Sequence, residues 1–472
     1  MKNFETMNPE TKRALTHARN FRERHLEELK AFLRIPSIGT QPERKAETEA
    51  AADWLAEAMQ EAGLENVQVI PTRGNPLVYS DWLHAAPDAP TVLIYGHYDV
   101  QPADPLYLWD TPPFEPTVKD DYIFARGAAD DKGQTYIHIK AIEAYLEGGA
   151  EGGGRLPVNV KFLVEGEEES GGHNLSLFVP ENGELLAADV ALISDTHILS
   201  PEQPAIVYGL RGMCYVFLDV TGPRRDLHSG SFGGGVDNPL NALSHIIAAL
   251  KNKDGHIQIP GFYDAVRPLS DEERQLLAKH PFDEEAWLSE NGAPKSWGEP
   301  EYTLVERLGA RPTLDVNGII GGYTDEGMKT VLPARAHAKI SMRLVPDQKP
   351  KEIYEQLRNY VQQIAPPSVR VRCQFMHGAP ASITDYNIPA IQAAAAAYEQ
   401  VFGREPVYIR EGGSIPVVGL FQEHLGLETV MMGFGLPDDC IHSPNERFYL
   451  PNFYRGIETA ILFFYEYSRL SS

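Results

Sequence analysis

One stretch constrains the fold and the chemistry of this chain more than any other: a buried strand that ends in carboxylates. Residues 158–164 alternate in polarity and then become apolar, which is typical of a core β-strand. Acidic clusters usually lie on helix surfaces, but at the end of a core strand their charges repel one another unless a cation compensates them. A metal site is therefore favoured over a solvated acidic surface. The acidic residues are Glu165, Glu167, Glu168 and Glu169, followed by Ser170-Gly171-Gly172.

Length and composition exclude several classes of protein. A chain of 472 residues is too long for one core, so we expect at least two domains. A net charge of −24 argues against nucleic-acid binding and against anionic membrane surfaces. The first 30 residues lack the apolar core of a signal peptide, and no long apolar run predicts a membrane span. Three scattered cysteines without a CxxC pair fit a reducing compartment, so we expect a cytoplasmic protein.

A second apolar strand, residues 91–95, leads directly into Gly96-His97-Tyr98-Asp99. In an extended chain, His97 and Asp99 project to the same face. A lone histidine after a strand is more often structural than a ligand. A ligating histidine usually has a carboxylate partner, however, so the sequence at this point leaves both interpretations open.

Three more candidate ligands follow the same pattern. Asp130 precedes a helix, where it could simply be an N-cap. Asp195 follows the apolar strand 188–193, and His442 precedes residues 443–446, whose N-cap serine, proline and capping-box glutamate predict a helix start. Because the carboxyl ends of strands in an α/β sheet meet along one edge, we expect these groups to gather there.

The sequence pattern changes near residue 211 and returns to the first pattern near residue 386. We predict an α/β catalytic domain, a mixed sheet flanked by helices with a di-metal site at strand carboxyl ends, formed by residues 1–210 and 386–472. Residues 211–385 are predicted to form an inserted α+β domain of ferredoxin-like type, itself carrying an insertion at 254–312. Its expected elements are strand 213–220, helix 239–250, strand 337–344, helix 350–363 and strand 369–375.

The candidate ligands suggest a reaction class. Two histidines and several carboxylates, with no thiolate, suit a hydrolytic pair of Zn²⁺ or Mn²⁺ ions rather than structural zinc. Such a pair needs a bridging carboxylate and a water between the ions, and a carboxylate that binds no metal to take the proton of that water. Adjacent glutamates can supply both functions, one as a ligand and the other facing the substrate.

Taken together, these motifs resemble one family. It is the dinuclear-metal family of aminoacylases, carboxypeptidase G, succinyl-diaminopimelate desuccinylase and carnosinase-type dipeptidases. The resemblance spans nearly the whole chain and is closest to the cytosolic carnosinase and Cys-Gly dipeptidase branch. The general motifs are HxD at 97–99, GxxDxKG at 127–133, EGxEESG at 165–171, SDT at 194–196 and the late His442; the branch-like motifs lie at 226–230, 342–346 and 410–416.

The resemblance implies a ligand set for two divalent ions. His97 and Asp195 are expected to bind one ion, and Glu169 and His442 the other. Asp130 is expected to bridge the two ions, with a cis peptide following it.

The resemblance also implies the groups that carry out the reaction. Asp99 is expected to orient His97, and Glu168 to act first as the general base and then as the acid for the leaving amine. Glu167 is a glutamate as well, so the identity of the base depends on aligning the Glu-Glu-Ser-Gly sequence.

Further residues implied by the resemblance come from the inserted domain and from the loop near residue 413. His228 is expected to stabilise the oxyanion from a partner subunit, which makes the inserted domain a lid and dimerisation domain and the enzyme a homodimer. Thr330, also donated across subunits, together with Arg343, Gly413 and Ser414, is expected to hold the substrate. An arginine is suited to clamping a carboxylate.

We therefore predict a metallopeptidase that hydrolyses dipeptides or short peptides with a free C-terminal carboxylate. One alternative is a deacylase of N-acyl or N-succinyl amino acids that uses the same metals. Another is a catalytically idle relative with a binding role, although such relatives generally lose a ligand or the base.

Overall fold

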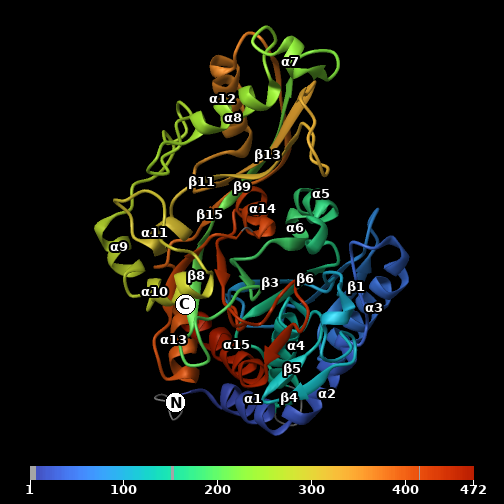
Figure 1. Cartoon of the computed structure of the whole chain (residues 1–472). Helices are drawn as coiled ribbons and strands as arrows, with labels where there is room; N and C mark the ends of the chain where they lie inside the picture. Colours follow the sequence, from blue (N-terminus) through green and yellow to red (C-terminus); the bar gives the residue numbers. More distant parts are fainter. Residues whose placement is uncertain (1–6, 150–153, 414, 472) are drawn as a thin grey trace. The chain divides into compact units, whose positions relative to one another are not determined.

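The computed structural model describes residues 7–149, 154–413 and 415–471, and the chain forms two compact units. Unit 1 comprises Met1–Tyr208, Thr384–Tyr408 and Pro416–Ser472, and unit 2 comprises Gly209–Ile383 and Ile409–Ile415. Figure 1 shows the course of the chain.

Unit 1 is built on a mixed sheet. Its helices are α1 (Pro9–Asn20), α2 (Arg22–Leu33), α3 (Lys45–Glu61), α4 (Lys132–Glu147), α5 (His173–Glu181), α6 (Gly183–Leu186), α13 (Pro389–Phe402), α14 (Pro416–Leu425) and α15 (Leu450–Leu470), with short 3₁₀ turns η2 (Pro42–Arg44), η3 (Leu106–Leu108) and η4 (Glu168–Ser170). Its strands are β1 (Glu65–Ile70), β2 (Leu77–Trp82), β3 (Thr91–His97), β4 (Thr117–Lys119), β5 (Tyr122–Phe124), β6 (Asn159–Glu165), β7 (Val190–Ile193), β17 (Thr429–Met431) and β18 (Arg447–Tyr449). β8 (Ala205–Leu210) and β16 (Val407–Glu411) lie across the boundary between the units.

The order of strands places the ends of the central ones together. The sheet runs β1-β2-β6-β3-β7-β17-β8 and continues to β15 (Ser382–Ile383), and β16 also pairs with β8. β6, β3, β7 and β17 are mutually parallel, whereas β1, β2 and β8 are antiparallel to their neighbours. His97 at the end of β3 is in register with Glu165 at the end of β6, and Tyr95 is in register with Ile193 of β7. The carboxyl ends therefore lie side by side, as the sequence predicted.

Helices cover both faces of this sheet because its central strands are apolar on both sides. Val92 and Ile94 of β3 are buried in the large core to which α1–α4, α13 and α15 contribute. On the opposite face, Tyr95 packs edge-on against Phe421 of α14. The predicted α/β fold, a mixed sheet flanked by helices, is confirmed.

Unit 2 contains an antiparallel sheet of order β11-β13-β9-β14. If only the two helices that pack on this sheet, α8 and α12, are counted, the chain order is βαββαβ, which is the ferredoxin-like arrangement. β9 alternates strictly between buried and partly exposed residues, so one face packs on the helices. The elements are β9 (Gly212–Thr221), β10 (Leu227–His228), α7 (Ser229–Phe232), α8 (Pro239–Leu250), α9 (Asp271–Leu277), α10 (Glu284–Glu290), α11 (Leu304–Gly309), β11 (Thr313–Gly321), β12 (Val331–Leu332), β13 (Arg335–Leu344), α12 (Pro350–Ile364), β14 (Arg370–Ala379) and β15 (Ser382–Ile383).

One local prediction is wrong. Residues 443–446 form turns and not the first turn of a helix, and the next element is the short strand β18. Asn445, which would be the second residue of that helix, has a φ of 65°, which a right-handed helix does not allow. The carboxylate of Glu446 accepts hydrogen bonds from another loop, as described below, and so does not form a capping box.

Among the described residues, no helix is both long and apolar enough to cross a membrane.

Candidate metal centre

One aspartate connects two histidines that are far apart in sequence. Asp130 lies just before α4, and the peptide bond between it and Asp131 is cis. Oδ1 of Asp130 is 3.0 Å from Nε2 of His97, and Oδ2 is 2.8 Å from Nε2 of His442. A carboxylate that presents one oxygen to each of two imidazoles has the arrangement of a ligand shared by two ions.

Two groups of ligand atoms share this aspartate. His97 and Asp195 complete the first group, with 4.0 Å between Nε2 and Oδ2. Glu169 and His442 complete the second, with 3.3 Å between Oε2 and Nε2. The structure thus brings together the five residues that the sequence analysis proposed as metal ligands.

The four glutamates after β6 have different surroundings. Glu165 is buried and accepts a hydrogen bond from the Tyr95 hydroxyl at 2.5 Å. Glu167 accepts hydrogen bonds from the backbone N–H of Asn75 at 3.1 Å and from the side-chain amide of Asn174 at 2.6 Å. The hydrogen bonds of Glu167 occupy both of its oxygens, whereas Oε2 of Glu165 is buried and has no hydrogen-bond partner among the described residues. Glu169 belongs to a ligand group with Asp130 and His442, and Glu168 interacts electrostatically with Glu169, Asp130 and His97.

Asp99 contacts both the first histidine and the glutamate loop. Nδ1 of His97 is 3.0 Å from the backbone oxygen of Asp99 and 3.5 Å from its carboxylate. The same carboxylate accepts the backbone N–H groups of Glu168 and Glu169, each at 3.2 Å. Asp99 is fully buried, so these contacts fix the orientation of the imidazole relative to the two glutamates.

The electrostatics of the site show an excess of negative charge. Burial, together with repulsion from Asp130 and Asp131, holds the pKa of Asp195 well above its ordinary value. Burial raises the pKa of Glu168 to about 7, and Glu169 and Asp130 add to this shift while His97 opposes it. Hydrogen bonds with Asp130 and Glu169 raise the pKa of His442 to about 10.

The residues present fit divalent cations. Oε1 of Glu169 is buried and has no hydrogen-bond partner among the described residues, although Oε2 accepts one from Gln101 at 2.8 Å. A cation would compensate the mutually repelling carboxylates and use this oxygen. The imidazole and carboxylate donors, without thiolate, suit Zn²⁺ or Mn²⁺.

Gln101 is a site residue that sequence reasoning missed. It lies in the proline-rich segment after β3, where no periodicity or motif distinguishes it. Its side-chain amide orients the Glu169 carboxylate toward His442. Only its place in the fold identifies it.

The predicted substrate-binding residues lie in unit 2. His228 and Thr330 are exposed neighbours: β10 pairs with β12, and the N–H of Ser229 donates to the backbone oxygen of Thr330 at 3.0 Å. Arg343 is partly buried on β13, and Gly413 is exposed. Ser414 lies outside the described residues.

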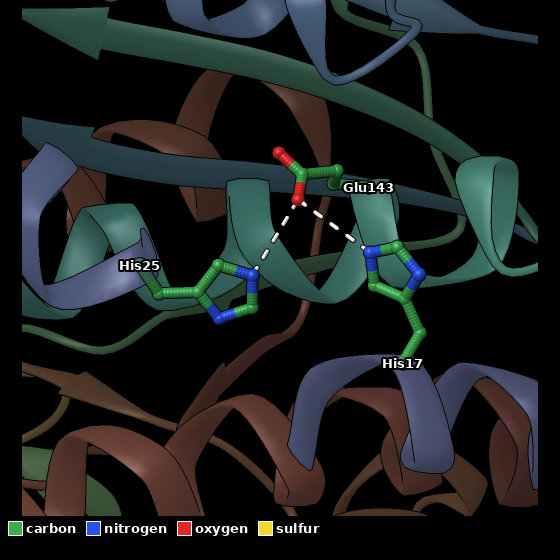
Figure 2. Close-up of side chains that lie close together, drawn as sticks. All are labelled: His17, His25 and Glu143. Carbon is green, nitrogen blue, oxygen red and sulfur yellow. Dashed lines mark ion pairs between the residues drawn. The ribbon is translucent and has the colours of Figure 1, made fainter. Parts of the chain in front are cut away.

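A second group of potential ligands lies elsewhere in unit 1. It consists of His17 from α1, His25 from α2 and Glu143 from α4. Figure 2 shows both imidazole rings facing one carboxylate oxygen, with Nε2 to Oε1 distances of 3.8 and 3.5 Å. Arg24 and Lys140 also pair with Glu143, so two cations already compensate its charge. We interpret this group as a buried charge network that holds α1 and α2 on α4.

Glu143→Gln should lower the free energy of unfolding by about 3–5 kcal/mol, because it removes the buried carboxylate that pairs with the buried Lys140 and with Arg24. Glu147→Gln is the matched control on the same helix: its carboxylate is 43% exposed, so we expect a change of about 0.5 kcal/mol or less. Urea unfolding of both variants checks this. Equal losses would contradict the buried network.

The same network predicts a pH dependence of stability. Burial opposes the charged form of Glu143, but the nearby imidazoles of His17 and His25 and the charge of Lys140 hold its pKa below the ordinary value of 4.5. A lowered carboxyl pKa in the folded state stabilises the fold above the unfolded-state pKa, and this contribution is lost as the pH falls below it. The stability difference between wild type and Glu143→Gln should therefore shrink below about pH 4.5 in urea unfolding. A stability difference between wild type and Glu143→Gln that stays constant below about pH 4.5 would contradict a lowered pKa of Glu143.

Known proteins are similar to this chain in both sequence and fold. The model of peptidase family M20/M25/M40 matches residues 93–466. The Cys-Gly metallodipeptidase of Schizosaccharomyces pombe is 36% identical over 82% of this chain and 81% of its own, and the human beta-Ala-His dipeptidase is 33% identical over 84% and 78%. The crystal structure of an M20 family metallo-carboxypeptidase from Sulfolobus solfataricus superposes with a TM-score of 0.82 at 34% identity, covering 94% of this chain and 99% of that one.

The family match extends from β3 into α15 and therefore includes every ligand candidate grouped around Asp130. The aligned relatives cover most of both chains, and the shared fold extends through both units. This chain, in which Asp130 belongs to two groups of potential metal ligands, is therefore a member of peptidase family M20/M25/M40.

Proposed function

We propose that this protein is a metal-dependent dipeptidase that hydrolyses dipeptides or short peptides with a free C-terminal carboxylate. The observation that carries the proposal is Asp130, which lies between His97 and His442, with the carboxylate of Glu168 near enough to interact electrostatically with Asp130 and His97. The names of the relatives, Cys-Gly metallodipeptidase and beta-Ala-His dipeptidase, support the choice of dipeptides.

We propose that the site holds two divalent ions, Zn²⁺ or Mn²⁺. His97 and Asp195 would hold one, Glu169 and His442 the other, and Asp130 both. When bound, such ions supply Lewis-acid polarisation of the scissile carbonyl and lower the pKa of water.

Glu168 is proposed to move the proton in the reaction. Its carboxylate has no hydrogen bond within the part of the chain that the structure describes, and burial with repulsion from Glu169 and Asp130 raises its pKa, which favours the uptake of a proton. We propose that its Oε atoms accept the proton of the attacking water and then deliver it to the leaving amine. Asp99 contacts both His97 and the backbone N–H of Glu168, so it fixes the position of the proposed base relative to this metal ligand.

Unit 2 is proposed to act as a lid and dimerisation domain, with His228 and Thr330 donated to the active site of a partner subunit. Both side chains are exposed in this subunit. β11 is an edge strand of the unit 2 sheet, and Ile319 and Ile320 at its end are 55% and 63% exposed. An open strand edge with exposed apolar residues is suited to pairing with a second copy of the chain. Arg343, Gly413 and Ser414 are proposed to hold the substrate, with Arg343 on its carboxylate.

A reducing, cytoplasmic location is proposed for the enzyme. The three cysteines are free, and one of them, Cys440, is exposed. An exposed thiol persists in the reduced form more readily in the cytoplasm than outside the cell.

Removal of metal provides a first test. Dialysis against a chelator should lower dipeptide turnover by at least about 100-fold, because Glu168 alone can neither polarise the scissile carbonyl nor lower the pKa of the water. Titration of the stripped enzyme with Mn²⁺ or Zn²⁺ should restore turnover, and calorimetry of the same titration should show two ions per subunit. Undiminished turnover after verified metal removal would exclude the proposed chemistry.

A further inference from the structure

His442 is the ligand candidate with the least support from regular structure. Its side chain is 52% exposed, whereas that of His97 at the end of β3 is fully buried. It lies in a turn between β17 and β18 and has a φ of 59°. Some other contact must therefore hold this loop against Asp130.

The side chain of Glu446, four residues after His442, provides such a contact. It is fully buried, and both of its oxygens accept hydrogen bonds from the segment that ends at Asp130. Oε1 accepts the backbone N–H of Ala129 at 3.0 Å and of Asp130 at 3.2 Å. Oε2 accepts the backbone N–H of Gly127 at 2.9 Å. The Arg126 guanidinium donates to Oε2 as well, at 2.7 Å.

Arg126 also connects the segment of Asp130 to the loop of His442. It is 1% exposed, and besides Glu446 it donates to the backbone oxygens of Ser443 and Pro102, each at 3.2 Å. Ser443 directly follows His442. In addition, the backbone N–H of Ala125 donates a hydrogen bond to the backbone carbonyl oxygen of Glu446 at 3.1 Å.

We propose that Glu446, paired with Arg126, is a positioning residue that sets the distance between Asp130 and His442. It thereby sets the affinity of the second group, which Asp130 forms with Glu169 and His442, for its metal ion. This inference rests on the metal ligands of the proposed function. A buried carboxylate that accepts four hydrogen bonds from one loop has little freedom to move, and groups behind metal ligands typically change metal affinity by about 10- to 100-fold when removed.

The two metal groups should respond differently to loss of this contact. Both groups contain Asp130, but the histidine of the first group, His97, is held in place by the central strand β3 and Asp99 without any contact with Glu446. The second depends on His442, whose loop is fixed to the segment of Asp130 through Glu446 and Arg126. A role in general stability alone would affect neither group selectively.

The test compares Glu446→Gln with Glu299→Gln. Glu299 is the matched control because it is also buried and also pairs with an arginine, Arg311, at 2.6 Å, but lies in unit 2. In calorimetric titrations of the full-length stripped enzyme with Mn²⁺, Glu446→Gln should weaken one of the two binding events by about 10- to 100-fold and leave the other within about threefold. Glu299→Gln should leave both Mn²⁺ affinities unchanged, even if its Tm falls as far as that of Glu446→Gln.

Activity supplies a second readout. At limiting Mn²⁺, Glu446→Gln should show a lowered kcat with little change in KM, and excess Mn²⁺ should restore kcat. If Glu446→Gln does not fold, Glu446→Asp keeps the charge but withdraws the carboxylate from one pair of donors, and the same selective loss is expected.

The outcomes separate this inference from the proposed function. Unchanged affinities in folded Glu446→Gln or Glu446→Asp, with a lowered Tm only, would overturn the positioning role. Wild-type protein that binds no metal would overturn the proposed function itself.

Discussion

Replacement of Glu168 by alanine should lower kcat for dipeptide hydrolysis by about 10²–10⁴-fold, the usual contribution of a positioned general base. Glu168 lies beside the two metal groups without belonging to either, so metal content and affinity should stay near those of wild type. Steady-state kinetics together with metal analysis of the purified variant provide the measurement. Loss of metal on this substitution would mean that the functions of Glu168 and Glu169 are exchanged.

Glu167→Ala is the control for the register of the glutamates. Its carboxylate accepts hydrogen bonds from Asn75 and Asn174, so its loss should destabilise the loop but leave kcat within about tenfold of wild type. A collapse of kcat as large as that in Glu168→Ala, with intact metal binding, would move the base to position 167.

Replacement of His228 by alanine should lower kcat by about 10²–10³-fold, the size expected when one donor to a developing oxyanion is removed. His228 lies in unit 2 and belongs to neither metal group, so metal content should not change. Full activity of this variant would rule out the oxyanion role.

A mixture of the two inactive variants tests whether His228 acts across subunits. In a heterodimer of Glu168→Ala and His228→Ala, a trans arrangement gives one site with both residues and one site with neither. Random exchange should therefore recover about a quarter of wild-type turnover. A cis arrangement leaves every site defective, and no recovery would be seen. Exchange is verified separately by tagging one variant and recovering the mixed dimer.

Much of the fold was predictable because local pattern and tertiary structure agree. The apolar runs at 91–95 and 158–164 became neighbouring parallel strands whose ends present His97 and the glutamates. Asn238 caps α8 by accepting the N–H of Leu240, as its sequence indicates. Where strand polarity or a cap decides the structure, sequence alone is enough.

Other features depend on partners distant in the chain. The segment 443–446 has the composition of a helix start, but the carboxylate of Glu446 binds the loop of Asp130 instead of its own backbone, and four tertiary hydrogen bonds outweigh one cap. Likewise, Glu167 differs from Glu168 because its carboxylate accepts hydrogen bonds from Asn75 and Asn174. No spacing in the sequence predicts that these two asparagines lie next to Glu167.

The most direct test of the central claim is turnover of a substrate panel by metal-stripped enzyme reloaded with Mn²⁺ or Zn²⁺. The panel comprises Cys-Gly, Ala-Gly and β-Ala-His beside N-acetyl and N-succinyl amino acids. We expect metal-dependent hydrolysis of the dipeptides and little release from the acylated compounds. Release from the acylated compounds alone, or no turnover with either metal, would contradict the proposed dipeptidase activity.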